Sequence, residues 1–217
     1  MKKLILALVV FASIQLNAQK SFYKGALVAD ANYGIDIYNV HFHYELKTSP
    51  YTKYDSYDKA GSKSFSLGGQ YGITNWFGAG LRIKSDNFIV SQDSVTKITP
   101  KATGVEVGLI TDFHMVRTKH FNLSAGLDIG YSNFTYSAND KAGNQLYGSG
   151  LWTNFHIIPR VYFGRFGLNI ALNFPAVRYN NMTYSNKTLN QYINPSWRGS
   201  GFGVTFGIQY RFFKPVK

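Results

Sequence analysis

The sequence contains no cysteine, and its acidic residues are few. Among 217 residues there are 11 aspartates and glutamates against 23 lysines and arginines, so the formal net charge is +12. The absence of cysteine excludes a disulfide scaffold, a thiolate metal site and a lipidated N-terminal cysteine. Only 16% of the residues are charged while 17% are aromatic, which argues against intrinsic disorder. The basic balance indicates nucleic acid or an anionic membrane surface as a partner.

No apolar run reaches the length of a transmembrane helix, which needs about 20 residues. The run Leu4–Ala12 follows two lysines and precedes the small-residue sequence Leu16–Ala18. These features predict a cleaved secretory signal peptide over residues 1–18 and one mature domain over residues 19–217. An uncleaved interfacial anchor is the alternative interpretation. Because an exported chain does not meet the nucleoid, we expect no nucleic acid among its partners.

Apolar residues recur at every second position along most of the remaining chain, which is the period of a β-strand. In residues 201–212, large apolar side chains occupy one face, and glycine and polar residues occupy the other. Seven further segments share this two-faced pattern: residues 27–37, 65–73, 77–83, 105–113, 121–131, 151–163 and 166–174.

The connections between these eight segments alternate in length. Three are tight turns, at residues 74–76, 117–120 and 164–165. The other four are long and polar, at residues 47–63, 91–101, 139–149 and 180–198. An even number of strands with short turns on one side and long loops on the other is typical of a membrane barrel. The sequence therefore predicts an all-β fold, an eight-stranded antiparallel up-and-down transmembrane β-barrel.

A soluble lipocalin-like barrel, with apolar residues inside, is the alternative to this topology. We favour the membrane barrel because glycine, serine, asparagine and threonine cannot fill an eight-stranded interior without charged side chains as plugs. In three segments the apolar set changes face, at Tyr38, Phe88 and Phe134. Each change indicates either a β-bulge or a strand that leaves the bilayer. Since all three lie toward the long loops, we interpret the strands as projecting beyond the membrane there.

If the polar face lines the lumen, its charged residues face one another. Charges withdrawn from bulk water must be paired, so we expect an ion-pair network that blocks the lumen, with a contact such as that between Glu106 and Arg82. A porin for large solutes is disfavoured. The network comprises Asp30, Asp36, Arg82, Lys84, Asp86, Glu106, Asp112, Asp128, Arg160 and Arg211, with His114 and His156 beside it.

Together, the signal sequence, the eight two-faced strands, the alternating connections and the closing aromatic strand 202–213 resemble small outer-membrane barrels of the OmpA and OmpX type. The chain is more similar still to the outer membrane protein beta-barrel domain family that includes PorT-like proteins. The resemblance covers the whole mature chain. It implies a location in the cell outer membrane and contact with the barrel assembly machinery, but it brings no catalytic or ligand motif. Such barrels commonly finish on an aromatic residue, whereas here residues 214–217 follow Phe213.

Some outer-membrane barrels are lipid A-modifying enzymes or proteases, which need histidine with serine or a carboxylate near the membrane surface. His41, His43 and Glu45 share one strand face and are the candidate ligands for a divalent metal. No further ligand follows at a recognisable spacing, so we favour a polar strand rim. The sequence predicts no catalytic residue and no cofactor.

The long loops carry tyrosines and basic residues. Tyrosine among polar neighbours makes an adaptable contact surface, and we expect one at Tyr51, Tyr54, Tyr57, Tyr192 and Trp197. Loop lysines and arginines suit the phosphates of lipopolysaccharide. Solvated loops without a specific partner are the alternative.

The predicted function is a non-enzymatic outer-membrane barrel with a structural or surface-interaction role in the Gram-negative envelope. Its expected partners are outer-membrane lipid, lipopolysaccharide and an extracellular or envelope protein. Two alternatives remain open: a small-solute pore or secretion-machinery component, and a lipid A-modifying enzyme.

Overall fold

The computed structural model describes residues 21–47, 52–90, 97, 99–138, 143–180 and 182–212. The predicted signal peptide, residues 1–18, and the predicted contact residue Tyr51 lie outside this part of the chain. Within the described residues, no helix has the length and apolar character needed to span a membrane. The elements are β1 (Leu27–Leu46), β2 (Thr52–Gly72), β3 (Phe77–Ile89), β4 (Lys101–Arg117), β5 (Phe121–Ser137), β6 (Gln145–Phe163), β7 (Phe166–Tyr179), β8 (Thr183–Tyr184), α2 (Lys187–Tyr192) and β9 (Ile193–Arg211).

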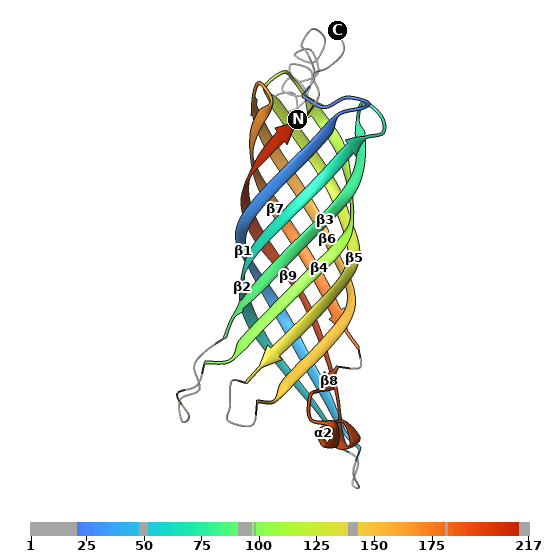
Figure 1. Ribbon diagram of the computed structural model, residues 1–217, viewed down its shortest axis with the longest axis vertical. Helices are drawn as coiled ribbons and strands as arrows, with labels where there is room; N and C mark the ends of the chain where they lie inside the picture. Colours follow the sequence, from blue (N-terminus) through green and yellow to red (C-terminus); the bar gives the residue numbers. More distant parts are fainter. Residues whose placement is uncertain are drawn as a thin grey trace, which may run out of the picture.

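Eight long antiparallel strands form a closed ring (Figure 1). Strands β1 to β7 follow one another around the wall, and β9 pairs with both β7 and β1 to close it. The two-residue strand β8 pairs with β6 inside the last long connection. The wall strands range in length from 13 residues in β3 to 21 residues in β2. Each is longer than the roughly 9–11 residues that a strand needs to cross a bilayer. The predicted fold class is therefore confirmed.

Three of the predicted loops are shorter than expected. In the predicted loop 139–149, β6 already begins at Gln145. β2 begins at Thr52, so most of the predicted loop 47–63 is strand, with Leu46 opposite Thr52 in register. The predicted loop 180–198 contains β8 and α2, and β9 already begins at Ile193. The alternation of apolar residues does not extend into these segments, because their outer face is not apolar, although their backbones continue the ladder of hydrogen bonds. The barrel wall is therefore taller at the long-loop end than the sequence indicates.

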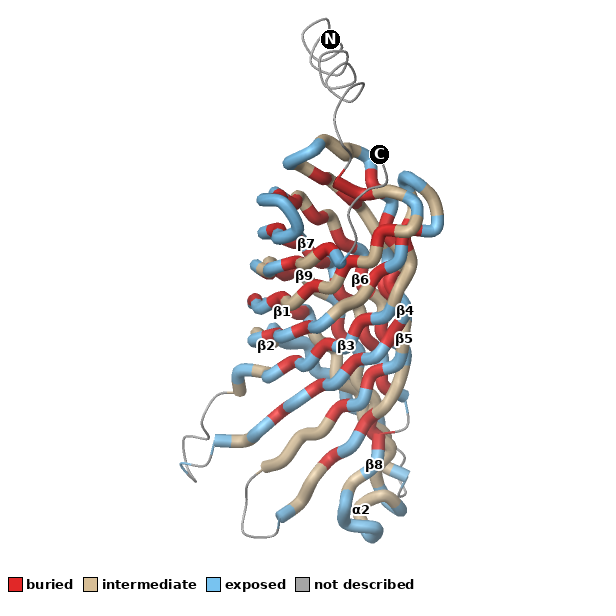
Figure 2. The backbone as a smooth tube through the Cα atoms, turned by 45° about the horizontal axis from the view of Figure 1, so that its top comes forward, coloured by how far each residue is buried: buried red, intermediate tan, exposed pale blue. Residues whose placement is uncertain are grey.

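Through the middle of the wall, buried and exposed residues alternate along every strand (Figure 2). The exposed positions carry large apolar side chains: Ile35 is 54% exposed, Leu81 62%, Leu109 57% and Ile208 61%. The buried positions of the same strands are mostly polar. An outward apolar band around a polar interior is the arrangement of a membrane β-barrel, in which lipid covers the band. We call this part of the wall the membrane band.

The three changes of face are not β-bulges. β1 pairs with β2 and with β9 in continuous register across Tyr38, and the pairings across Phe88 and Phe134 are also continuous. Side chains keep pointing in and out as before, but the inward side chain changes from Asp36 to an aromatic ring at Tyr38. A register shift occurs instead between His114 and Val116, near a short turn. The strands therefore run straight into a region of reversed polarity, which we call the projecting end.

Candidate functional site

The ten predicted lumen charges all lie on inward-facing strand positions and are buried. Arg82 on β3 reaches across the lumen, where its Nη1 donates to Asp128 Oδ2 at 2.8 Å and its Nη2 lies 3.7 Å from Asp30 Oδ1. Glu106 does not meet Arg82 as expected, because the β3–β4 register places it opposite Lys84. Its Oε1 accepts a hydrogen bond from Ser132 Oγ at 3.0 Å. Arg82 thus ties β3 to β5 and to β1, each two strands away around the ring.

A second group of charges lies in the same layer. Arg160 Nη2 donates to Asp112 Oδ2 at 2.8 Å. His156 Nε2 lies 2.7 Å from Asp112 Oδ1, and its Nδ1 lies 3.4 Å from Asp128 Oδ2. Because Asp128 also holds Arg82, the two groups form one continuous network across the lumen.

A third group lies next to the projecting end. Lys84 Nζ is 2.7 Å from Asp36 Oδ2 and donates to Asp86 Oδ2 at 2.9 Å. Two hydroxyls complete the shell of Asp86: Tyr38 donates at 3.2 Å and Ser62 at 3.1 Å. Buried charges are tolerated only when paired and hydrogen-bonded, which is the state of Lys84 and Asp86.

The segment before β1 closes the barrel at the short-turn end. Phe22 is 1% exposed, and its ring stacks on His114 with centroids 3.5 Å apart. Ser21 donates from its backbone N–H to the Thr118 carbonyl at 2.9 Å and accepts from Arg211 Nη1 through its own carbonyl at 2.8 Å. The last predicted lumen charge therefore holds this N-terminal cap. Periodicity could not reveal the cap, because a short irregular segment has no repeating pattern.

Aromatic side chains close the lumen at the projecting end. Trp197 stacks on Phe134 with centroids 5.6 Å apart and on Tyr179 at 5.2 Å. Trp152, 1% exposed, belongs to the same apolar cluster. The prediction of Trp197 as a surface contact is thus corrected: its position on β9 faces inward, and its ring packs in the cluster.

The space left between the charges and the aromatic cluster is small. A cavity of about 20 Å³ is lined by Arg82, Lys84, Asp128 and Trp152, with neighbours from four other strands. This volume holds about one water molecule. With most of its charges in ion pairs and both ends capped, the lumen of the described chain is closed.

The outer rim gathers the predicted metal candidates. His41 Nε2 lies 2.5 Å from Asp55 Oδ1, and His43 Nδ1 lies 2.9 Å from the same oxygen. Glu45 Oε1 lies 3.5 Å from His43 Nε2 and 3.0 Å from Lys53 Nζ. In the part of the chain that the structure describes, no group of three or more such side chains has an arrangement that could hold a metal ion. The β1–β2 register brings in Asp55, which linear spacing could not show.

The proximity of these groups changes their proton affinities. The hydrogen bond with Asp55, followed by that with Glu45, raises the pKa of His43 above its ordinary value of 6.5 despite partial desolvation. The hydrogen bonds from His43 and His41 lower the pKa of Asp55 below 3.8. The cluster is therefore a titrating polar rim on the outer face of the projecting hairpin.

Three predicted contact tyrosines remain accessible. Tyr57 is 73% exposed and stacks on His41 with centroids 4.4 Å apart. Tyr54 is 45% exposed and stacks on Tyr44 at 4.8 Å, and Tyr192, 48% exposed, ends α2. Stacking fixes the first two rings in place while leaving one face of each to the surroundings.

Comparison with solved structures supports the fold. The outer membrane protein OprG from Pseudomonas aeruginosa is 13% identical, with a TM-score of 0.60, covering 90% of this chain and 99% of that one. The attachment invasion locus protein Ail of Yersinia pestis is 13% identical, with a TM-score of 0.42 and coverage of 87% and 99%. Neisserial surface protein A is 13% identical, with a TM-score of 0.44 and coverage of 84% and 98%. No protein-family model and no curated protein matches the sequence. At this identity, the likeness to OprG establishes a small barrel fold shared with an outer-membrane protein.

Proposed function

We propose that this chain is a non-enzymatic outer-membrane β-barrel protein that acts at the surface of the Gram-negative envelope and does not conduct solutes. The observation that carries the proposal is the closed lumen. Paired charges cross it in the membrane band, Phe22 caps one end and the Trp197 cluster caps the other. A barrel built in this way has a lipid-facing wall but no water-filled path.

The orientation follows from the two ends of the barrel. Small outer-membrane barrels have short periplasmic turns and longer extracellular connections. In this proposal, the projecting end, which carries the β1–β2 hairpin, β8 and α2, lies outside the cell (Figure 1). Tyr54, Tyr57 and Tyr192 there offer the contact surface for an extracellular or envelope protein partner.

Export and assembly complete the proposal. Residues 1–18 act as the cleaved signal peptide, and the barrel assembly machinery inserts the mature chain. Closure of β9 on β1 forms the last pair of the ring. N-terminal sequencing of the protein from outer-membrane fractions is expected to begin near Gln19.

Planar-bilayer recording of the full-length folded protein tests the closed lumen. We expect no large stable conductance, with a large-solute porin in the same bilayer as the positive control. Folding is checked by the change in electrophoretic mobility on boiling that folded barrels show. A reproducible porin-sized step would contradict the proposal.

The alternatives of a small-solute pore or secretion component and of a lipid A-modifying enzyme are not favoured by any contact in the described residues. Small stable currents in the planar-bilayer recording would support the small-solute pore. Mass spectrometry of lipid A from cells with and without the gene tests the second, since an altered acyl pattern requires chemistry.

A further inference from the structure

The outer face of β1, β9 and β7 carries three parallel rows of side chains where the membrane band meets the projecting end. The lowest row is apolar. Ile37 and Phe202 are directly opposite each other in the β1–β9 ladder and are 55% and 44% exposed. Phe174 on β7 packs edge-on against Phe202 with centroids 5.5 Å apart. This row continues the lipid-facing surface to its upper boundary.

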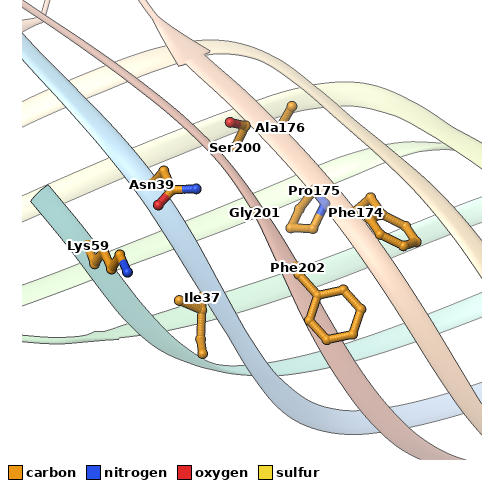
Figure 3. Close-up of a pocket in the computed structure, with 9 residues that line it drawn as sticks. All are labelled: Ile37, Asn39, Lys59, Phe174, Pro175, Ala176, Ser200, Gly201 and Phe202. Atoms are coloured by element: carbon orange, nitrogen blue, oxygen red, sulfur yellow. The ribbon is translucent and has the colours of Figure 1, made fainter. Parts of the chain in front are cut away.

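The middle row is made of small side chains. Asn39, Ser200 and Ala176 are neighbours in the ladders, with Lys59 of β2 at the row's edge. Because these side chains are short, the wall is hollowed here, and a depression of about 570 Å³ opens between Phe174, Phe202, Ile37 and Lys59 (Figure 3). Pro175 lies in its floor, where the β7–β9 pairing passes from Asn173 to Ala176.

The upper row is cationic. Arg198 of β9 is directly opposite Arg178 of β7 and, on its other side, opposite His41 of β1. Both arginines are exposed. Like charges directly opposite each other destabilise a sheet, yet among the described residues neither arginine forms an ion pair. A second depression of about 380 Å³, lined by His41, Tyr57 and Arg198, joins this row to the middle one.

From these rows we infer that the depression is a binding site for a lipid of the outer leaflet that carries a phosphorylated head group. Four residues along a strand separate the apolar row from the arginine row, a rise of about 13 Å. Acyl chains lie against Ile37, Phe174 and Phe202, the sugar or glycerol part fills the hollow, and the phosphates meet Arg178, Arg198 and Lys59. Charge-assisted hydrogen bonds from guanidinium to phosphate are strong and geometrically specific.

The inference deepens the proposed function and rests on it, since the site lies at the outer-leaflet boundary only in the proposed orientation. The positive charge of the arginine row and its height above the apolar row together determine which ligand fits the depression. An acidic soluble segment would satisfy the arginines but would not span the height down to Phe174 and Phe202, which face acyl chains. A divalent cation would be repelled by the arginine row.

The test uses the full-length protein in neutral detergent, titrated with diphosphorylated lipid A and observed by native mass spectrometry. We expect retained lipid on the wild type and about a tenfold loss of apparent affinity in Arg178→Gln/Arg198→Gln. The variant Ala176→Trp fills the hollow without changing charge, and it is expected to weaken binding to a similar degree. The matched control, Lys101→Gln/Lys187→Gln, removes two exposed charges at the same end but outside the rows, and it should stay within about twofold of the wild type.

Two results would overturn the site. One is a double arginine variant that binds as the wild type does while its boiling-dependent mobility shows an intact barrel. The other is displacement of the lipid by millimolar inorganic phosphate, which would indicate an anion site without acyl recognition. Cell fractionation keeps this separate from the proposed function. If the protein is absent from the outer-membrane fraction, the proposed function is wrong even if the protein binds lipid A in detergent.

Discussion

The membrane band and the projecting end use the same strand faces with opposite polarity. On β1, inward Asp36 belongs to the charged network, whereas inward Tyr38 and Phe42, further along the same face, border or join the aromatic cluster. Outward residues reverse in the same way, from Ile37 in the band to His41 on the rim. Since the backbone ladder is continuous, the reversal of polarity comes from the surroundings of the wall. Side chains that face lipid are apolar, and where the wall is surrounded by water the apolar side chains face inward.

The two regions are consequently stabilised by different forces. In the band, lipid solvates the outer side chains about as well as a protein core does, so the hydrophobic effect gives little and the interior depends on ion pairs and hydrogen bonds. In the projecting end, burial of aromatic surface away from water contributes directly. The same kind of substitution is therefore expected to change stability by different amounts in the two regions.

Breaking the charged network is expected to have the largest effect. Arg82→Met leaves Asp128 and Asp30 buried without their arginine, and loss of one partner of a buried pair costs about 3–5 kcal/mol. Urea unfolding from lipid vesicles measures the loss. The exposed Lys101→Met is the control and should change stability by less than about 0.5 kcal/mol. The double change Arg82→Met/Asp128→Asn should recover part of the lost stability. If Arg82→Met alone is as stable as the wild type, the network does not stabilise the membrane band.

The aromatic cluster comes next. Phe134 is 8% exposed and contacts three other aromatic rings, so Phe134→Ala should destabilise the protein by about 3 kcal/mol. On the same strand, Tyr131 faces outward in the band and is 54% exposed. Tyr131→Ala is expected to cost less than about 1 kcal/mol, because lipid replaces the lost contacts. Equal losses in the two variants would remove the distinction between the regions.

Outward polarity gives a smaller effect with a clear position dependence. Leu109→Arg places a cation in the lipid-facing band and should cost about 2 kcal/mol in the same vesicle assay. Thr103→Arg lies on the same face of β4 but beyond the band, next to Asn87 and Thr135 in register, and should be nearly neutral. A neutral Leu109→Arg would place the membrane elsewhere on the wall.

The strand pattern predicted the barrel and the inward set of charges, because alternation reports which side a residue faces. It did not predict partners, such as Arg82 with Asp128 across the lumen, since these depend on the register of strands far apart in sequence. Phe22 was missed because a cap has no period, and Trp197 was assigned to a loop because the first part of β9, where it lies, lacks an apolar outer face. The three rows on β1, β9 and β7 need the ladder itself, as Arg178 and Arg198 are unrelated in the sequence.

The smallest effect concerns the rim of the projecting hairpin, where pH rather than lipid sets the interaction. The raised pKa of His43 means that its contact with Asp55 stabilises the hairpin at pH below 6.5 and is lost as pH rises through the higher folded-state value. The lowered pKa of Asp55 means that the same contact is present above pH 3.8 and is lost as pH falls through its lower folded-state value. The contact is therefore strongest between these limits, near pH 5.

Asp55→Asn removes the carboxylate, so the pKa of His43 should fall toward 6.5, as followed by the ring proton shifts of His43 in an NMR titration of the protein in detergent. His41 loses the same partner, while Glu45 remains 3.5 Å from His43 and keeps part of the shift. Asp58→Asn is the matched control, since Asp58 bonds the backbone of Lys59 and not a histidine. Because the pair is exposed, global stability should change little. An unchanged titration of His43 in Asp55→Asn would mean that the two strands do not hold this register in solution.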